Sequence, residues 1–166
     1  MTISGDHSGD DLTGMVKIGV VAKQLGISIR TIHMYERERL FIAHKNHAGT
    51  RLFSEKDIAW LIEVRKMIKS SISIAGIRSL LAQIPCWDAT KCSFVSRQEC
   101  PSLKDNDYPC WSNKKSKCFQ SIAICRQCKV YEMRFHIRDF KRHMMVSMRP
   151  DQNSPRPDGV TDNDSL

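Results

Sequence analysis

The stretch IGVVAKQLGISIRTIHMYERERL, residues 18–40, decides the fold expected for the first half of this chain of 166 residues. It begins with a short amphipathic helix whose apolar positions are Val20, Val21 and Leu25. Gly26 is typical of a residue that ends a helix, and Ser28 can cap the next helix through its hydroxyl. The second helix spaces its apolar residues at Ile29, Ile32 and Tyr35. Two helices joined by a glycine turn predict a helix-turn-helix, whose second helix enters the major groove of DNA.

The segment LFIAHKNHAGTRLFS, residues 40–54, is typical of a small β-hairpin, or wing, beside the helix-turn-helix. Gly49 can take the positive φ angle that its tight turn needs. Early positions of the recognition helix face the groove, whereas Lys45 and Arg51 are expected to contact phosphates. Tyr35 is favoured as a packing residue over a base reader, although it belongs to the candidate set. The candidate DNA contacts are Lys17, Arg30, Thr31, His33, Tyr35, Arg37, Lys45, His47 and Arg51.

Two further helices should complete this segment. Ser54 and Asp57 have the spacing of a capping box at the start of the first, although Asp stands where Glu is usual. Its expected stripe, apolar except for the arginine, is Ile58, Leu61, Ile62, Arg65 and Ile68. Ser73 should cap the second helix and Pro85 should stop it. The stripe of this second helix is Ile77, Leu80, Leu81 and Ile84.

The pieces IGVVAKQLGISIRTIHMYERERL, AGTRLFSEKDI and SISIAGIRSLL, in this order and spacing, resemble the MerR family of bacterial transcription regulators over about 70 residues. The resemblance implies a winged-helix DNA-binding domain that acts as a dimer on a palindromic operator and distorts promoter DNA to switch transcription. The chain has His33-Met34-Tyr35-Glu36 where the family usually has Arg-Tyr-Tyr-Glu. Because an imidazole replaces a permanent cation, the resemblance does not imply the operator sequence.

All seven cysteines lie within residues 86–128, with the spacing C-x5-C-x7-C-x9-C-x7-C-x6-C-x2-C. In a compartment where thiols stay reduced, such a cluster indicates metal or redox chemistry, and an odd count argues against complete disulfide pairing. The candidate metal ligands are a subset of Cys86, Cys92, Cys100, Cys110, Cys118, Cys125 and Cys128. Cys125 and Cys128 are the pair best suited to chelate one ion. Three interpretations stay open: an iron–sulfur cluster, a structural zinc site and a metal-free thiol switch.

The cysteine pattern also resembles a module of bacterial sensor proteins called the two-CW domain. The matching pieces are Cys86-Trp87, Cys92, Cys100-Pro101, Tyr108-Pro109-Cys110-Trp111, Cys118 and Cys125-x-x-Cys128-x-Val130-Tyr131. The resemblance covers about 45 residues and implies a sensory or ligand-holding accessory unit, without implying which species it holds.

The last periodic segment has the apolar spacing of a coiled-coil seam. Its positions are Val130, Met133, Ile137, Phe140 and Met144. We expect a C-terminal helix that pairs with its copy in a homodimer, as the C-terminal helix of the MerR family does. The alternative is that this helix docks onto the chain's own helices.

The basic charge suits a polyanionic partner such as nucleic acid, with plain solubility as the alternative that charge alone leaves open. The net charge is +8, and it rises to +14 for residues 15–149 once the acidic ends are removed. No run of about 20 apolar residues occurs, so no membrane span is expected. The polar N-terminus lacks the features of a secretory signal, which favours the cytoplasm. No nucleotide-binding glycine loop and no acid–base pair supports an enzyme.

The sequence therefore predicts a mainly α protein with a winged helix-turn-helix, a small irregular Cys-rich metal-binding module and a C-terminal dimerisation helix. The segments are 15–85, 86–128 and 129–149, flanked by disordered ends 1–14 and 150–166. We expect a DNA-binding transcription regulator of the MerR type that meets RNA polymerase at a promoter and senses redox or metal state through an iron–sulfur cluster or zinc. The alternatives are the same regulator with purely structural zinc and, from a different class, a small redox or electron-transfer protein.

Overall fold

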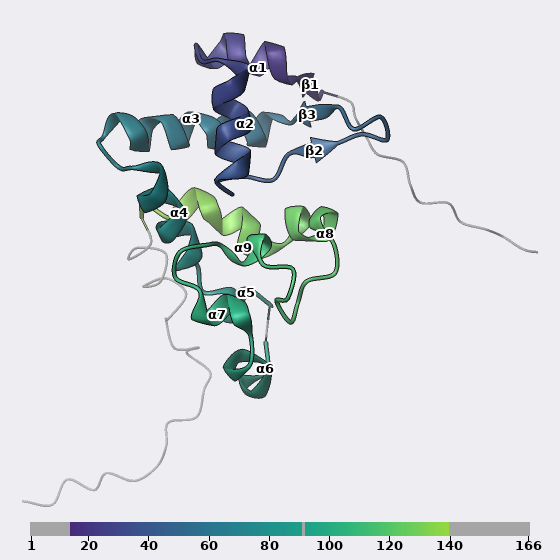
Figure 1. Cartoon of the computed structure of the whole chain (residues 1–166), viewed down its shortest axis with the longest axis vertical. Helices are drawn as coiled ribbons and strands as arrows, with labels where there is room; N and C mark the ends of the chain where they lie inside the picture. The colour runs from purple at the N-terminus through teal and green to yellow at the C-terminus, as the bar shows by residue number, and fades with distance from the viewer. Residues whose placement is uncertain (1–13, 91, 140–166) are drawn as a thin grey trace, which may run out of the picture.

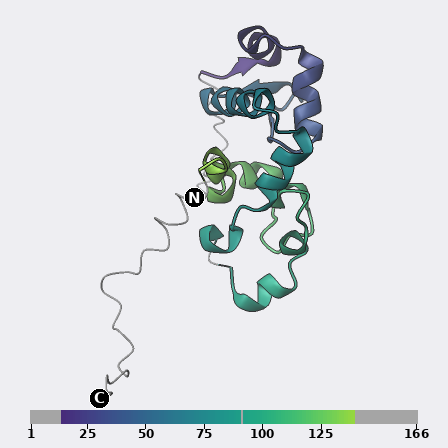
Figure 2. The ribbon, with the colours of Figure 1, turned by 90° about the vertical axis from the view of Figure 1, so that its left-hand side faces the viewer.

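The computed structural model describes residues 14–90 and 92–139, whose elements form two stacked groups (Figures 1 and 2). The first group is β1 (Val16–Lys17), α1 (Ile18–Leu25), α2 (Ile29–Arg37), β2 (His44–Lys45), β3 (Arg51–Phe53), α3 (Glu55–Lys69) and α4 (Ile74–Ala82). The second is α5 (Cys86–Thr90), α6 (Phe94–Gln98), α7 (Pro101–Lys104), η1 (Cys110–Ser112), α8 (Ile122–Gln127), α9 (Lys129–Glu132) and η2 (Met133–His136). The predicted disorder of 150–166, and nearly all of that of 1–14, lies outside the described residues.

The predicted helix-turn-helix is confirmed as α1 and α2, which pack against each other. Gly26 ends α1 with a left-handed φ angle of 61°. Ser28 caps α2, since its hydroxyl accepts a hydrogen bond of 3.1 Å from the amide of Thr31. The expected apolar faces are confirmed at Val21 and Ile32, which are buried, but Val20 and Ile29 are exposed because they lie at the edges of these faces.

The wing is confirmed as the antiparallel pair β2 and β3, and it belongs to a three-stranded sheet in the order β1-β3-β2. Gly49 has the predicted positive φ angle, 75°. The sequence did not indicate β1, in which Val16 pairs with Phe53 of β3. This strand brings the start of the domain alongside the wing.

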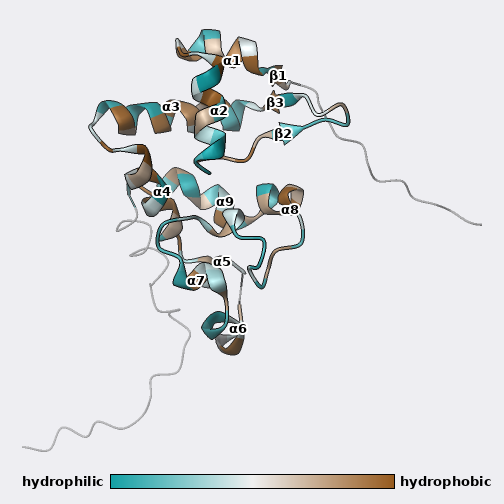
Figure 3. Ribbon diagram, in the orientation of Figure 1, coloured by the Kyte–Doolittle hydropathy of each residue, from teal (hydrophilic) through white to brown (hydrophobic). Residues whose placement is uncertain are grey.

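The caps of α3 and α4 are confirmed. Ser54 and Asp57 form the predicted capping box, and the hydroxyl of Ser73 accepts from the amide of Gly76. The predicted stripe of α3 is confirmed at Leu61, which is buried, and Ile58 and Ile68 pack partly buried against the core. The prediction missed Trp60, Val64 and Met67, which complete the buried apolar face. Ile62 is instead exposed, as is Leu80 on α4. Figure 3 shows hydrophobic and hydrophilic positions alternating along α3, as expected of a helix with one buried face.

One hydrophobic core continues from the first group of elements into the second. Trp111, Val130 and Tyr131 belong to the same cluster as Trp60 of α3. The ring of Trp111 meets that of Tyr131 edge-on at 5.1 Å, and Phe135 meets Trp60 at 5.7 Å. The second group of elements is therefore packed onto the first group rather than connected to it only by the chain.

The C-terminal segment differs from the single helix predicted over 129–149. Its described part is α9 followed by the 3₁₀ helix η2. Val130 and Ile137 of the predicted seam are buried in the chain's own core, where the aromatic rings offer them an apolar surface. The seam positions Phe140 and Met144 lie outside the described residues. Within those residues, no helix has the length and apolar character needed to cross a membrane.

Candidate nucleic-acid interface and cysteine cluster

The candidate DNA contacts lie mainly on the exposed side of α2 and on the wing. Those exposed to solvent are Lys17, Arg30, Arg37, Lys45 and His47. Thr31, His33 and Arg51 are half-buried. The hydroxyl of Thr31 lies 2.9 Å from that of Ser28, so part of its hydrogen-bonding capacity is used at the helix cap. Arg30 and Arg37 are thus the most accessible cations of the recognition helix.

Tyr35 is the exception among the candidates, because its side chain is only 3% exposed. Burial raises the pKa of its hydroxyl, while a hydrogen bond from Arg65 of α3 acts in the opposite direction. This contact also explains why an arginine stands in the expected apolar stripe of α3. Tyr35 belongs to the core that positions α2, and its side chain is not on the exposed face of that helix.

Glu36 is a residue that the sequence reasoning missed. Its carboxylate accepts a hydrogen bond of 2.6 Å from Nε of Arg51 and lies 3.9 Å from Nζ of Lys45. Both cations come from the wing, so Glu36 ties the wing to the recognition helix. Since Arg51 is already paired, a phosphate contact there would have to share the guanidinium with Glu36.

Five of the seven cysteines line two small neighbouring cavities. Four of them line one cavity of about 50 Å³: Cys110, Cys118, Cys125 and Cys128. Trp111 and Tyr131 also line it. Cys86 and Trp87 line a neighbouring cavity, to which Cys110 also contributes. Trp111 and Trp87 therefore lie at the walls of the cysteine cavities, and Trp111 is also a core residue.

The thiols are close enough to influence one another electrostatically. Burial, followed by the thiols of Cys118, Cys100 and Cys92, raises the pKa of Cys86 to about 11. Burial, followed by Cys86 and Cys118, also raises the pKa of Cys110 strongly. These two thiols are therefore protonated at neutral pH unless a bound cation stabilises their thiolates.

The donor chemistry of this cluster suits a thiophilic metal, but its geometry does not yet fit one. Across residues 14–90 and 92–139, no three His, Cys, Asp or Glu side chains are grouped closely enough to hold one ion. All seven thiols are free. A metal centre here remains a prediction that requires the thiols to draw together.

The sequence of the first group of elements matches known regulators. Residues 16–84 match the family model of the MerR HTH family regulatory proteins. The N-terminal half is a MerR-type helix-turn-helix domain. It is 31% identical over 72 residues to the HTH-type transcriptional regulator TnrA of Bacillus subtilis (strain 168), covering 43% of this chain and 64% of that protein. It is also 31% identical over 64 residues to the HTH-type transcriptional regulator GlnR of Bacillus anthracis, covering 39% of this chain and 50% of that protein.

The chain thus covers less than two thirds of the length of these relatives, and both alignments are shorter than the chain's described part. Among solved structures, the chain is similar to HiNmlR, described as a MerR family regulator lacking the sensor domain, bound to promoter DNA. That similarity covers 80% of this chain and 84% of the other, at 15% identity and a TM-score of 0.36. The domain assignment therefore depends on the sequence comparisons.

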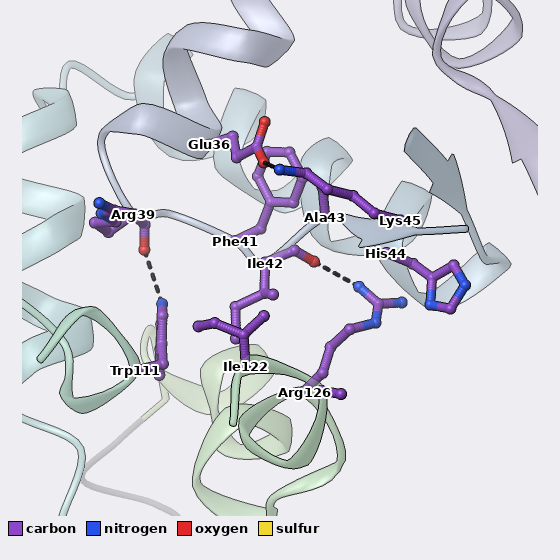
Figure 4. A pocket seen from close by; sticks show the side chains of 11 residues that line it. Glu36, Arg39, Phe41, Ile42, Ala43, His44, Lys45, Trp111, Ile122 and Arg126 are labelled. Carbon is purple, nitrogen blue, oxygen red and sulfur yellow. Dashed lines mark hydrogen bonds and ion pairs between the residues drawn. The ribbon is translucent and has the colours of Figure 1, made fainter. Parts of the chain in front are cut away.

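The cysteine-rich segment contacts the loop that joins α2 to the wing (Figure 4). Trp111 donates its indole N–H to the carbonyl of Arg39 at 3.0 Å. Ile42 is held on both sides: Arg126 donates to its carbonyl, and its amide donates to the hydroxyl of Tyr131 at 2.8 Å. A pocket of about 330 Å³ lies between this loop and α8. The sequence reasoning missed Arg126, although a lone arginine between Cys125 and Cys128 marks its position.

Proposed function

We propose that this protein is a DNA-binding transcription regulator of the MerR type. The observation that carries the proposal is the match of residues 16–84 to that family, over the same residues that form the helix-turn-helix, the wing and the helix pair. In this proposal α2 enters the major groove, where Arg30, Thr31 and His33 read bases. The wing cations and the remaining exposed basic residues contact phosphates and fix the position of the protein on the duplex.

A palindromic operator would be bound by a homodimer, and the promoter setting makes RNA polymerase a further partner. The described seam residues Val130 and Ile137 are buried in the chain's own core. Two copies would therefore have to pair through surfaces other than Val130 and Ile137. Sedimentation of the full chain, alone and with DNA, would test the dimer.

The cysteine cluster would bind a metal or an iron–sulfur cluster and report redox or metal state. Supporting this are the four thiols that line one cavity and the thiol of Cys86 in the neighbouring cavity, to which Cys110 also contributes. Purely structural zinc is the alternative. Purification without oxygen, followed by metal analysis and a visible spectrum, distinguishes an iron–sulfur cluster from structural zinc. A brown protein with bound iron and sulfide supports the cluster, whereas a colourless protein with zinc supports the alternative.

DNA binding is tested by selecting duplexes from a random-sequence pool with the full chain and measuring affinity against salt. Phosphate contacts predict a steep loss of affinity as salt increases. A protein that selects no duplex even at low salt would refute the proposed function.

A further inference from the structure

We propose that Arg126 is a positioning residue for the DNA-binding surface, and that a change at Cys125 and Cys128 reaches the recognition helix and the wing through it. This inference rests on the proposed DNA-binding function and adds the route by which the cysteine cluster would influence it.

Arg126 connects the cysteine-rich segment to the MerR-type domain at two points. Its guanidinium makes a two-pronged contact with the carboxylate of Asp57, at 2.7 and 3.1 Å, and also donates to the carbonyl of Ile42. The Asp57 side chain is 3% exposed and that of Arg126 is 16% exposed. A bidentate pair shielded from water in this way fixes both distance and orientation.

The two acceptors belong to different parts of the DNA-binding architecture. Asp57 lies in the first turn of α3, where its carboxylate also accepts from the amide and the hydroxyl of Ser54 at the helix cap. Ile42 lies in the loop between the end of α2 and the start of β2. One guanidinium therefore fixes this loop relative to α3, and the loop joins the recognition helix to the wing.

Any movement of Cys125 or Cys128 also moves Arg126. It lies next to Cys125 in α8, and Cys128 follows directly after that helix. Because α8 has only six residues, it cannot shift at Cys125 without carrying Arg126 with it. Cys125 and Cys128 line the thiol cavity, whereas Arg126 lies in the pocket on the side of the loop (Figure 4).

The first test removes the ion pair between Arg126 and Asp57 by replacing both residues, so that neither charge is left buried without its partner. The double variant R126M/D57N lacks both charges, and the amide side chain introduced by D57N keeps an oxygen for the amide of Ser54. Its matched control is K117M/E99Q, which removes an ion pair of 3.3 Å that lies wholly inside the cysteine-rich segment. We expect hydrogen exchange of residues 39–45 to be faster in R126M/D57N alone, and its affinity for a selected duplex to fall about tenfold. The control should match the wild type in both respects.

The second test asks whether the cysteines act through Arg126. C125S/C128S is introduced into the wild type and into R126M/D57N, and duplex affinity is measured for all four proteins. We expect the cysteine substitutions to change affinity about tenfold in the wild type and to have no effect once Arg126 and Asp57 are replaced, since residues that act through one another are non-additive. C92S is the control, because its effect should be the same in both backgrounds.

Equal effects of C125S/C128S in the two backgrounds would overturn the inference, as would unchanged exchange of residues 39–45 in R126M/D57N. If circular dichroism shows that R126M/D57N is unfolded, R126K takes its place, because lysine keeps the charge but cannot make the forked contact. The proposed function fails separately, if the wild type binds no duplex DNA. In that case, the hydrogen-exchange rates of residues 39–45 in R126M/D57N would still show whether Arg126 stabilises the loop between α2 and β2.

Discussion

The two regions of this molecule are stabilised in different ways. Residues 14–84 contain helices with regular caps and a face of large buried side chains, as in the 15-residue α3. Residues 85–139 contain helices of three to six residues and rely on contacts with the first region. The side chains of Trp111, Arg126 and Tyr131 each form a hydrogen bond with the backbone of the MerR-type domain. Short helices need tertiary contacts to form, so the second region depends on the first.

The largest expected effect tests whether both regions share one core. Trp60 is 1% exposed, donates to the carbonyl of Leu40 at 2.8 Å and contacts Phe135 of the second region. Trp60→Ala should lower the free energy of unfolding by about 3–5 kcal/mol. Urea unfolding followed by circular dichroism measures this, with Val95→Ala as the control at an exposed site. Loss of structure in residues 16–84 while residues 86–139 stay folded would contradict a shared core.

The next effect places DNA recognition in the first region. Arg30→Ala should weaken binding to a selected duplex by about 1–3 kcal/mol, because a groove-facing arginine supplies both charge and hydrogen bonds. Lys104→Ala in α7 removes an equal charge far from α2 (Figure 1) and is the control. Fluorescence anisotropy measures both. Comparable losses in the two variants would mean that net charge, and not α2, determines binding.

A smaller effect contrasts helix caps in the two regions. Ser54→Ala removes the capping box of α3 and should cost about 1–2 kcal/mol of unfolding free energy. Ser93→Ala removes the cap of the five-residue α6 and should cost about 0.5 kcal/mol, since that helix is short and its cap is exposed. Urea titrations of the two variants side by side give the difference. A larger loss for Ser93→Ala would show that the second region contributes more to stability than its packing indicates.

Local rules were sufficient to predict the helix caps of the first region. Gly26, Ser28 and Ser54 act where their chemistry predicts, because caps depend on neighbouring residues only. The prediction for α3 included Leu61 but missed Trp60, Val64 and Met67, because tertiary contacts decide which edge of an apolar face is covered. Strand β1 was missed because two residues carry no periodic signal.

The second region could not be predicted in the same way. The contacts of Arg126 with Asp57 and Ile42 join residues that are far apart in the chain, and no local pattern encodes such pairs. For the same reason Glu36 was not recognised as the partner of Arg51. The clustering of the cysteines was visible in the sequence, but the cavity that brings four of them together depends on the fold.

The central claim is that the MerR-type domain of this chain binds duplex DNA. The most direct measurement is the equilibrium affinity for a selected duplex over a series of salt concentrations. We predict that the logarithm of the association constant falls linearly with the logarithm of salt, with a slope of about −0.9 for each phosphate contacted. Absence of binding at low salt, or an affinity that does not depend on salt, would contradict the account.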